Sequence, residues 1–499
     1  MNLAMLLEMA GDGGGDRVAL GPRPDGLTHA ELLARAQRAA SWFAARPGVN
    51  VGMIGVNSDA TPICLFGAAI AGRPFAPLNY RWSDDQLRRA AARLAPAVVI
   101  VDEGVAARLG PLDGVEVVER GRFLAEIEDA VPLTAPAGDT AAPAVLLFTS
   151  GTSGDPKVAV LRHENLTSYI LGTVEFMGAD EDDAALVSVP PYHIAGISGL
   201  LSSVFGGRRI VHLEAFDPEV WVETAGRESV THAMVVPTML ARILEVLDRD
   251  PDVGLPVLRH LSYGGGRMPL PVIEAAVRRL PHVDFVNAYG LTETSSTIAL
   301  LTPDDHRDAL ASPDPAIRAR LGSVGRPLPT VEVEIRDAGG ATVEPGLRGE
   351  IWVRGEQVSG EYLGTGSTRD DGGWFPTKDG GWIDAGGFLF VEGRLDDVIV
   401  RGGENISPGE VEDALIAHPD VSDAAVVGIP DDDWGELVAA VVVPVDGGDI
   451  DPVALQEWVR SRLRSSKTPA VIEVRDLLPY NDNGKLLRRQ LRAELGLPR

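Results

Sequence analysis

The stretch AVLLFTSGTSGDPK (144–157) joins a short apolar run to a loop of small and hydroxyl-bearing residues. The apolar run is typical of a buried strand. In the loop, small residues let successive backbone N–H groups approach an anion, and Ser and Thr hydroxyls add further donors. Lys157 supplies a positive charge, but Pro156 and the spacing from Gly151 differ from the Walker A pattern. The stretch favours a phosphate-binding loop after a strand, with an ordinary polar surface loop as the alternative.

Helical and strand-like patterns alternate through roughly the first 390 residues. Two helix starts carry the capping-box pattern: Thr28 with Glu31, and Ser83 with Gln86. Apolar runs typical of buried strands occur at 49–56, 97–101, 186–190, 208–213, 231–236 and 284–289. Strand and helix repeated in this way predict an α/β fold with parallel-type sheets sandwiched by helices.

The character of the chain changes at about residue 331, where short alternating strands with Gly-rich turns begin. The runs at 331–337, 349–355 and 388–394 predict an antiparallel, β-barrel-like part. A candidate boundary lies at GRLDD (393–397), and the following residues are numerous enough for a small α+β domain. We therefore expect a large domain over 1–393, a hinge at 394–397 and a small mobile domain over 398–499.

Composition excludes several classes of partner. The 499 residues include 45 Lys plus Arg and 72 Asp plus Glu, so the net charge is −27. Such a chain should repel nucleic acid and anionic membrane surfaces. The apolar run around Cys64 has too few residues to span a bilayer, and a single Cys excludes an intrachain disulfide. The amino terminus lacks a basic leader. We expect a soluble cytoplasmic protein without nucleic-acid or integral membrane partners.

Six further motifs follow the loop in order. They are PPYHIAG (190–196), YGGGRMP (263–269), NAYGLTET (287–294), WFPTKDGGWIDAGGF (374–388), GRLDDVIVRGGENISPGEVE (393–412) and LPYNDNGKLLRR (478–489). With the loop, they resemble the acyl-adenylate-forming superfamily, which comprises acyl- and aryl-CoA ligases, luciferases and the adenylation domains of peptide synthetases. The resemblance covers nearly the whole chain.

Thr292 and Glu293 follow a predicted strand, at the edge where open α/β sheets bind ligands. A Thr hydroxyl can hold a phosphate oxygen, and a lone carboxylate suits Mg²⁺ that phosphates also hold; a helix cap is the alternative. The resemblance implies Thr292 on the α-phosphate and Glu293 on Mg²⁺. It implies an ATP site of Thr149, Ser150, Gly151, Thr152, Ser153, Gly154, Lys157, Gly265, Gly266, Asn287, Ala288, Tyr289, Gly290, Asp379 and Arg394.

Within that implied site, Asn287 and Tyr289 surround adenine, Asp379 accepts the ribose hydroxyls, and Arg394 lies near ribose and phosphate. Two positions depart from the family pattern, which usually has Gly at both. Lys378 precedes the ribose-binding aspartate, where it affects the turn geometry, and Val158 follows the loop lysine, where it affects loop mobility.

The positive charge of Lys485 can offset the electrostatic repulsion that arises when the acid is activated. A carboxylate that attacks an α-phosphate brings two anions together, and a cation touching both stabilises the transition state by several kcal/mol. From the residues alone, the preferred interpretation of Lys485 is a surface lysine in the basic run GKLLRR; with the family match, it resembles the adenylation lysine. His193 is either a structural residue or, as the resemblance implies, a gate between acyl pocket and thiol tunnel. The implied catalytic residues are Lys485, Thr292, Glu293 and His193.

The resemblance also implies a CoA site and a hinge. Asp396 is the implied hinge residue, and the segment Arg401, Gly402, Gly403 and Glu404 would line a pantetheine passage. Trp434 either stacks on the CoA adenine or is simply a partly buried tryptophan.

We therefore hypothesise an AMP-forming acid–thiol ligase. It would convert a hydrophobic carboxylic acid, ATP and CoA to a thioester through acyl-AMP, with Mg²⁺ as cofactor and a place in fatty acid metabolism. Two alternatives are a stand-alone adenylation enzyme that loads a carrier-protein phosphopantetheine, and a nucleotide-binding protein without catalysis. The apolar run 194–207 indicates a hydrophobic acyl group. The sequence leaves open whether the acid is aliphatic, alicyclic or aromatic, and whether the protein is a homodimer.

Overall fold

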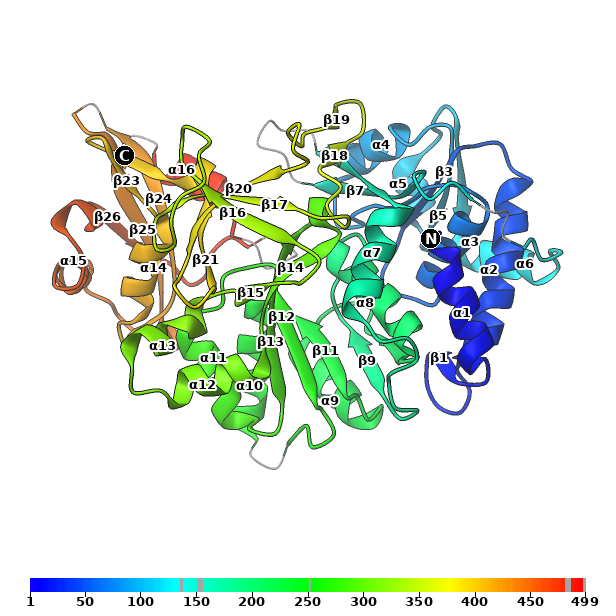
Figure 1. The fold of residues 1–499 in the computed structure, drawn as a ribbon, viewed down its shortest axis with the longest axis horizontal. Helices are drawn as coiled ribbons and strands as arrows, with labels where there is room; N and C mark the ends of the chain where they lie inside the picture. Colours follow the sequence, from blue (N-terminus) through cyan, green and yellow to red (C-terminus); the bar gives the residue numbers. More distant parts are fainter. Residues whose placement is uncertain (135–137, 150–155, 251–252, 432, 481–485, 497–499) are drawn as a thin grey trace.

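Two mixed sheets form the body of the protein in the computed structural model, which describes residues 1–134, 138–149, 156–250, 253–431, 433–480 and 486–496 (Figure 1). The nine-stranded sheet has the order β15 (Arg326–Pro327), β14 (Ser296–Leu301), β13 (Asp284–Leu291), β12 (His260–Gly264), β11 (His232–Val235), β9 (Ala184–Val187), β10 (Arg209–His212), β1 (Val18–Leu20) and β2 (Leu27–Thr28). From β13 to β1, neighbouring strands are parallel, which confirms the predicted type of sheet.

The eight-stranded sheet continues the same architecture. Its order is β19 (Gly366–Ser367), β18 (Glu361–Tyr362), β8 (Lys157–Arg162), β7 (Pro143–Thr149), β4 (Phe75–Pro77), β3 (Asn50–Ile54), β5 (Ala97–Val101) and β6 (Val115–Glu119). Strands β7, β4, β3, β5 and β6 are parallel, whereas β8 and β18 are antiparallel additions. The residues after 331 form a four-stranded antiparallel sheet of β16 (Glu332–Arg336), β17 (Gly349–Arg354), β20 (Phe375–Ile383) and β21 (Leu389–Arg394).

Helices cover the two large sheets (Figure 1). They are α1 (Ala4–Gly14), α2 (His29–Ala44), α3 (Ala60–Ile70), α4 (Asp84–Ala92), α5 (Val105–Leu109), α6 (Arg120–Glu128), α7 (His163–Thr173), α8 (Ile194–Gly206), α9 (Pro218–Arg227), α10 (Pro237–Arg249), α11 (Leu270–Arg279), α12 (Pro303–Ala311) and α13 (Pro315–Ala319). Both predicted capping boxes are present, at the starts of α2 and α4. No helix within the described ranges is both long and apolar enough to cross a membrane.

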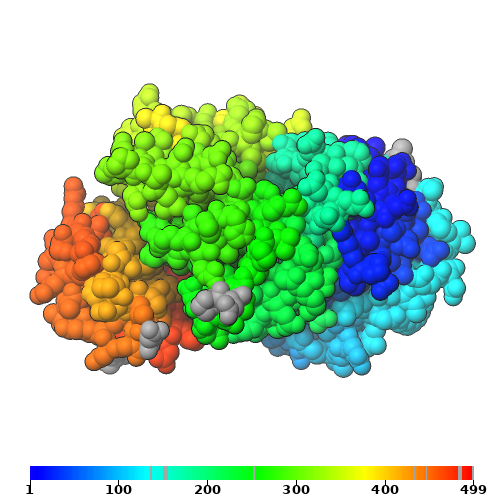
Figure 2. All heavy atoms as spheres, turned by 90° about the horizontal axis from the view of Figure 1, so that it is seen from below, coloured from blue at the N-terminus to red at the C-terminus, as the bar shows by residue number. Residues whose placement is uncertain are grey.

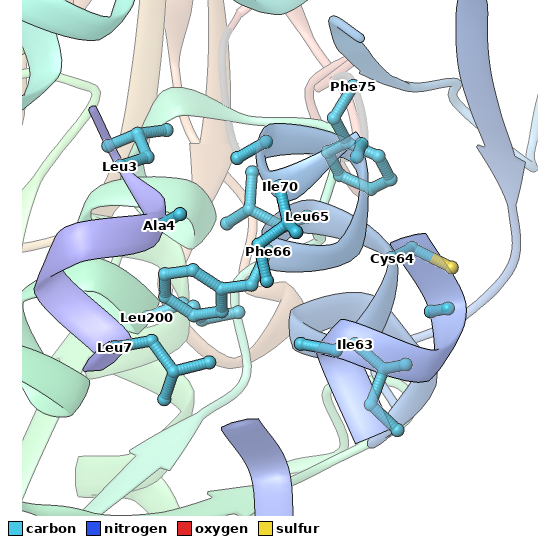
Figure 3. Close-up of a cluster of buried hydrophobic side chains, with 14 of the residues drawn as sticks. Leu3, Ala4, Leu7, Ile63, Cys64, Leu65, Phe66, Ile70, Phe75 and Leu200 are labelled. Atoms are coloured by element: carbon cyan, nitrogen blue, oxygen red, sulfur yellow. The ribbon is translucent and has the colours of Figure 1, made fainter. Parts of the chain in front are cut away.

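Helix α3 is buried along its whole length, which explains its uniformly apolar sequence. Figure 3 shows its side chains, including Phe66 and Ile70, beside Leu3 and Leu7 of the amino-terminal segment and Leu200 of α8. Cys64 lies in the same cluster, and burial raises the pKa of its thiol. Cys64 is therefore a small buried residue of the core.

Beyond β21 the chain forms a smaller α+β unit. A sheet of β23 (Glu404–Ile406), β22 (Ile399–Arg401), β25 (Gly435–Pro444), β24 (Val421–Asp431) and β26 (Val471–Val474) packs with α14 (Pro408–Ile416), α15 (Pro452–Arg460) and α16 (Arg488–Leu495). Figure 2 shows these carboxyl-terminal residues, orange to red, at one end of the molecule. An ion pair between Arg267 and Asp413 and a hydrogen bond from Ser407 Oγ to the Glu392 carbonyl (3.0 Å) join the two units.

Candidate active site

One group of the predicted nucleotide residues, namely Gly265, Gly266 and residues 287–290, lies in the carboxyl-terminal part of β13 and just beyond β12, near the edge at which open α/β sheets bind ligands. Gly264 ends β12 and pairs with Ala288 of β13. A Cβ at Gly264 would lie 2.3 Å from the Ala288 carbonyl oxygen, so this close approach requires glycine. The exposed Gly265 and Gly266 follow in the turn, and Gly265 has φ +77°. The edge therefore presents backbone rather than bulky side chains.

Strand β13 carries the predicted adenine residues and leads into a 3-10 turn, η1 (Thr292–Thr294). Asn287 Nδ2 donates to the Ser323 carbonyl at 3.1 Å, which fixes its amide. A Cβ at Gly290 would lie 1.8 Å from the Ser296 carbonyl oxygen, where β13 meets β14 at a register shift. Half-buried Thr292 and buried Glu293 follow directly.

Asp379 reaches this edge through an irregularity in β20. Trp352 of β17 pairs with Pro376 of β20, and Glu350 of β17 pairs with Gly380 of β20. Strand β20 has more residues than β17 between these two pairs, so Asp379 lies in a bulge. Lys378 adopts φ +62° in that bulge, and its backbone N–H donates to Glu350 Oε1 at 3.1 Å. A lysine thus occupies the left-handed position at which the resemblance leads us to expect glycine.

The carboxylate of Asp379 is only 7% exposed and is held on both oxygens. The Tyr289 hydroxyl donates to Oδ2 at 2.6 Å, and Arg394 Nε lies 3.3 Å from Oδ1. Burial and the charge of Asp379 raise the pKa of Tyr289, so the phenol stays protonated and donates at neutral pH. Arg394 Nη1 also donates to the Thr377 carbonyl at 2.6 Å. The result is an immobilised anion suited to accepting hydrogen bonds from hydroxyl groups.

Glu293, in η1 directly after β13, forms a second anionic position. It is 8% exposed, and its Oε1 accepts a hydrogen bond from the Tyr362 hydroxyl at 2.6 Å. Lys157 Nζ lies 5.1 Å from the centroid of the Tyr362 ring. Within the described ranges no cluster of three or more His, Cys, Asp or Glu side chains could hold a metal ion. The single carboxylate of Glu293 instead fits Mg²⁺, which typically takes one or two protein carboxylates plus phosphate oxygens.

The structure describes the predicted phosphate-binding loop only at its two ends, Thr149 and Lys157. Thr149 pairs with Lys157 across β7 and β8, and Thr149 Oγ1 donates to the Lys157 carbonyl at 3.4 Å. Val158 is buried, so its side chain, which is larger than the glycine usual in the family, fills core space. The Val158 carbonyl accepts a hydrogen bond from the Leu363 N–H at 2.8 Å. The predicted residues Ser150, Gly151, Thr152, Ser153, Gly154 and Lys485 lie outside the described residues.

His193 lies immediately before α8, half-buried. Its ring centroid is 4.6 Å from that of Tyr192, whose ring in turn contacts Tyr80 at 5.6 Å. This placement fits both interpretations of His193, as structural residue and as gate, and its catalytic role stays a prediction.

The predicted CoA residues gather on one hairpin of the small unit. Arg401 pairs with Glu404 across β22 and β23, and the turn between them needs positive φ at Gly402 (57°) and Gly403 (83°). The Gly402 N–H donates to the Trp434 carbonyl at 2.8 Å. The Trp434 ring is 53% exposed, with the Arg401 guanidinium carbon 5.6 Å from its centroid. The structure thus brings these residues together with an aromatic face open to solvent.

The predicted hinge residue, Asp396, is exposed in the 3-10 turn η3 (Leu395–Asp397), which lies between β21 and β22. Two residues that touch the site were missed by sequence reasoning, namely Tyr362 and Thr377. Tyr362 lies in a strand of only two residues, and its hydrogen bond to Glu293 spans 69 positions. No local periodicity marks such a contact.

Comparisons with known proteins show the family to which the chain belongs. The family described as AMP-binding enzyme matches residues 7–363, and the AMP-binding enzyme C-terminal domain matches 410–485. A feruloyl-CoA synthase of Amycolatopsis sp. is 35% identical over 480 residues, 94% of each chain. The o-succinylbenzoate CoA synthetase of Bacillus subtilis, solved with its acyl-adenylate intermediate, is 30% identical, with a TM-score of 0.83 over 98% of this chain and 97% of that one.

An amide bond synthetase of Marinactinospora thermotolerans is also 30% identical, with a TM-score of 0.86 over 99% of both chains. The matches thus cover the whole architecture, from the glycine-rich edge to the small carboxyl-terminal unit. This chain belongs to the AMP-binding enzyme family, the acyl-adenylate-forming superfamily that its motifs resemble.

Proposed function

We propose that this chain, an AMP-forming, ATP-dependent acyl-CoA synthetase, acts on an aryl carboxylic acid. In the first step, the acid attacks the α-phosphorus of ATP and releases pyrophosphate, giving acyl-AMP. In the second, the CoA thiol attacks the acyl carbon and AMP leaves. Adenylation is needed because a bare carboxylate offers no leaving group, whereas AMP is a stable one.

The observation that carries the site assignment is a pair of buried carboxylates next to β13: Asp379 of β20 is bound by Tyr289 of β13, and Glu293 follows β13 in η1. Asp379 and Glu293 are each held by a tyrosine hydroxyl at 2.6 Å. We assign Asp379 to the ribose hydroxyls, with Arg394 near ribose and phosphate, and Asn287 with Tyr289 to adenine. Mg²⁺, held by Glu293 and the phosphates, neutralises part of the triphosphate charge.

Two lysines bring the reacting anions together in this proposal. Lys157 binds phosphate at the end of the loop, and Lys485 contacts carboxylate and α-phosphate in the first step. The small domain over 398–499 then turns about Asp396, within the hinge at 394–397 and away from the large domain of 1–393. Hinges absorb large φ/ψ changes in few residues, and exposed η3 suits this role. The hairpin with Gly402 and Gly403 then lines the thiol passage.

The choice of an aryl acid rests on two relatives and one feature of the chain. The feruloyl-CoA synthase and the 2-succinylbenzoate–CoA ligases are named for acids with a benzene ring. In this chain Ser198 of α8 and Ser296 of β14 share a hydrogen bond at 3.0 Å. These hydroxyls would suit the oxygen substituents of an aryl ring. A role in fatty acid metabolism becomes the secondary expectation.

A substrate panel tests the proposal. Pyrophosphate release is followed with aryl, alicyclic and aliphatic acids from acetate to long-chain, each with CoA, a pantetheinylated carrier protein or a simple amine as acceptor. We expect the highest kcat/KM with a substituted aryl acid and CoA. A preference for long-chain aliphatic acids would contradict the aryl assignment. Preference for carrier protein or amine would contradict CoA as the acceptor.

We also propose a cytoplasmic location and a homodimeric state. Cell fractionation and light scattering of the purified chain test them directly. Recovery in a membrane or secreted fraction would contradict the first, and a monomeric mass at micromolar concentration would contradict the second.

A further inference from the structure

Tyr362 belongs to a short segment that holds Glu293 by both backbone and side chain. The N–H groups of Ser359 and Gly360 donate to the Glu293 carbonyl at 2.9 and 3.1 Å. Two residues later, the Tyr362 hydroxyl donates to Glu293 Oε1 at 2.6 Å. Strand β18 in turn pairs with β8 through Tyr362 and Ala159. The segment thus ties η1 to the strand that begins with Lys157.

The Tyr362 hydroxyl acts as a donor throughout the physiological pH range. A tyrosine hydroxyl carries its proton at neutral pH, so Tyr362 is the donor in its bond to the Glu293 carboxylate. Hydrogen bonds to a carboxylate are shorter and stronger than neutral ones. The bond at 2.6 Å therefore fixes the rotamer of Glu293.

The ring of Tyr362 has a second neighbour. Lys157 Nζ lies 5.1 Å from its centroid, within the distance at which an ammonium is attracted to an aromatic face. One side chain therefore contacts the two groups assigned above to metal and phosphate, through its hydroxyl and through its ring.

We propose that Tyr362 is a positioning residue for Mg·ATP. Its hydroxyl orients the Glu293 carboxylate toward the metal, and its ring orients the Lys157 ammonium toward phosphate. The inference rests on the proposed roles of Glu293 and Lys157. Partners that orient metal ligands typically change metal affinity 10- to 100-fold when removed.

Two substitutions separate the two contacts. Tyr362→Phe removes the hydroxyl and keeps the ring, whereas Tyr362→Leu removes both. The matched control is Tyr169→Phe, because the Tyr169 hydroxyl bonds Thr297 Oγ1 at 3.4 Å, outside the proposed site. Mn²⁺ binding is titrated by electron paramagnetic resonance with α,β-methylene-ATP bound and no acid present. Binding of the same analogue is also measured without metal.

We expect Tyr362→Phe to weaken Mn²⁺ binding about tenfold or more while metal-free nucleotide affinity is unchanged. Tyr362→Leu should weaken both. In the activity assay, excess Mg²⁺ should restore pyrophosphate release by Tyr362→Phe, and conversion of supplied acyl-AMP to thioester should be normal. Because the tyrosine acts through Glu293, Tyr362→Phe combined with Glu293→Gln should bind Mn²⁺ no more weakly than Glu293→Gln alone.

Wild-type Mn²⁺ affinity in Tyr362→Phe, or an equal loss in Tyr169→Phe, would overturn the inference and leave the proposed function intact. Additive losses in the double variant would also overturn it. Absence of acid-dependent pyrophosphate release by the wild-type chain would instead overturn the proposed function, which separates the two failures.

Discussion

Lys378 shows how a single residue shapes the candidate site. It occupies the left-handed region at φ +62° in the bulge before Asp379. For a residue with a Cβ this conformation costs roughly 1–2 kcal/mol. The hydrogen bond from its backbone N–H to Glu350 Oε1 offsets part of that cost. The bulge thus aims Asp379 at the site although the chain lacks a glycine there.

Lys378→Gly should therefore stabilise the folded protein. We expect a gain of about 0.5–1 kcal/mol, because relief of the left-handed strain exceeds the entropy that glycine adds to the unfolded chain. Thermal unfolding of the variant measures the gain. Lys378→Ala is the matched control, since it keeps the Cβ and should not be stabilised. An equal gain in both variants would contradict strain as the cause.

Much of the site was predictable at residue level because its residues lie in motifs. Asp379 and Glu293 were both predicted as site residues; Glu293 lies at the expected strand end, and Asp379 of β20 is held beside β13 by Tyr289. The two tyrosines that bind these carboxylates differ in whether the sequence predicts them. Tyr289 stands inside a motif, whereas Tyr362 meets Glu293 only through the tertiary fold, 69 positions away. Local pattern carries no information on such a contact.

At the scale of elements, prediction succeeded where local chemistry decides the structure. The capping box of Thr28 and Glu31 marks the start of α2, because the reciprocal hydrogen bonds are local (3.2 and 2.8 Å). The run 97–101 became β5 without change. The antiparallel additions β8 and β18 were not predicted: β8 pairs with β7 across a single loop, whereas β18, a strand of two residues, pairs with β8 from a distant part of the chain. The ion pair of Arg162 with Glu361, 199 positions apart, illustrates that separation.

The turn η3 is the element on which the two-step account depends. Asp396→Pro should slow thioester formation from supplied acyl-AMP at least tenfold and leave pyrophosphate release within a few-fold of wild type. Proline fixes φ near −65° and so restricts rotation at the proposed hinge. Both half-reactions are measured separately on the full chain. The control is Asp396→Ala, which keeps backbone freedom. Equal slowing of both half-reactions by Asp396→Pro would contradict the hinge assignment.

At the scale of the whole molecule, the two units contain titratable groups with opposite pKa shifts. Burial lowers the pKa of His163 in α7 to about 4, and its Nδ1 accepts the Leu3 N–H at 3.2 Å. Burial raises the pKa of Asp423 in β24 to about 6, with bonds from the Tyr480 hydroxyl and the Ala424 N–H opposing the shift. The folded state therefore resists protonation at His163 and favours it at Asp423.

Acidification from pH 7 to pH 5 should therefore affect the two units differently. His163 is neutral in both the folded and the unfolded state above pH 6.5. Below that pH the unfolded state gains a proton first, so the free energy of unfolding falls toward pH 4 by on the order of 2 kcal/mol. Asp423 destabilises the small unit when ionised, and this penalty, on the order of 1 kcal/mol between pH 7 and pH 5, is relieved as pH falls through 6. Calorimetry should show that the unfolding temperature of the large unit falls relative to that of the small unit.

Asp423→Asn provides the control for this pH response, because it keeps an acceptor for Tyr480 and removes the charge. It should stabilise the small unit at pH 7 and remove that unit's gain on acidification. A small-unit transition with the same pH dependence in Asp423→Asn and wild type would contradict the assignment to Asp423.

The whole molecule carries a net charge of −27 and yet must bring two anions together. The central claim is that Lys485 supplies the charge that permits adenylation and has no part in thioester formation. Lys485→Ala tests this directly, with both half-reactions measured on the same preparation. We predict that acid-dependent pyrophosphate release falls by orders of magnitude, while supplied acyl-AMP and CoA give thioester at a rate close to wild type. Equal loss of both half-reactions, or normal pyrophosphate release, would contradict the account.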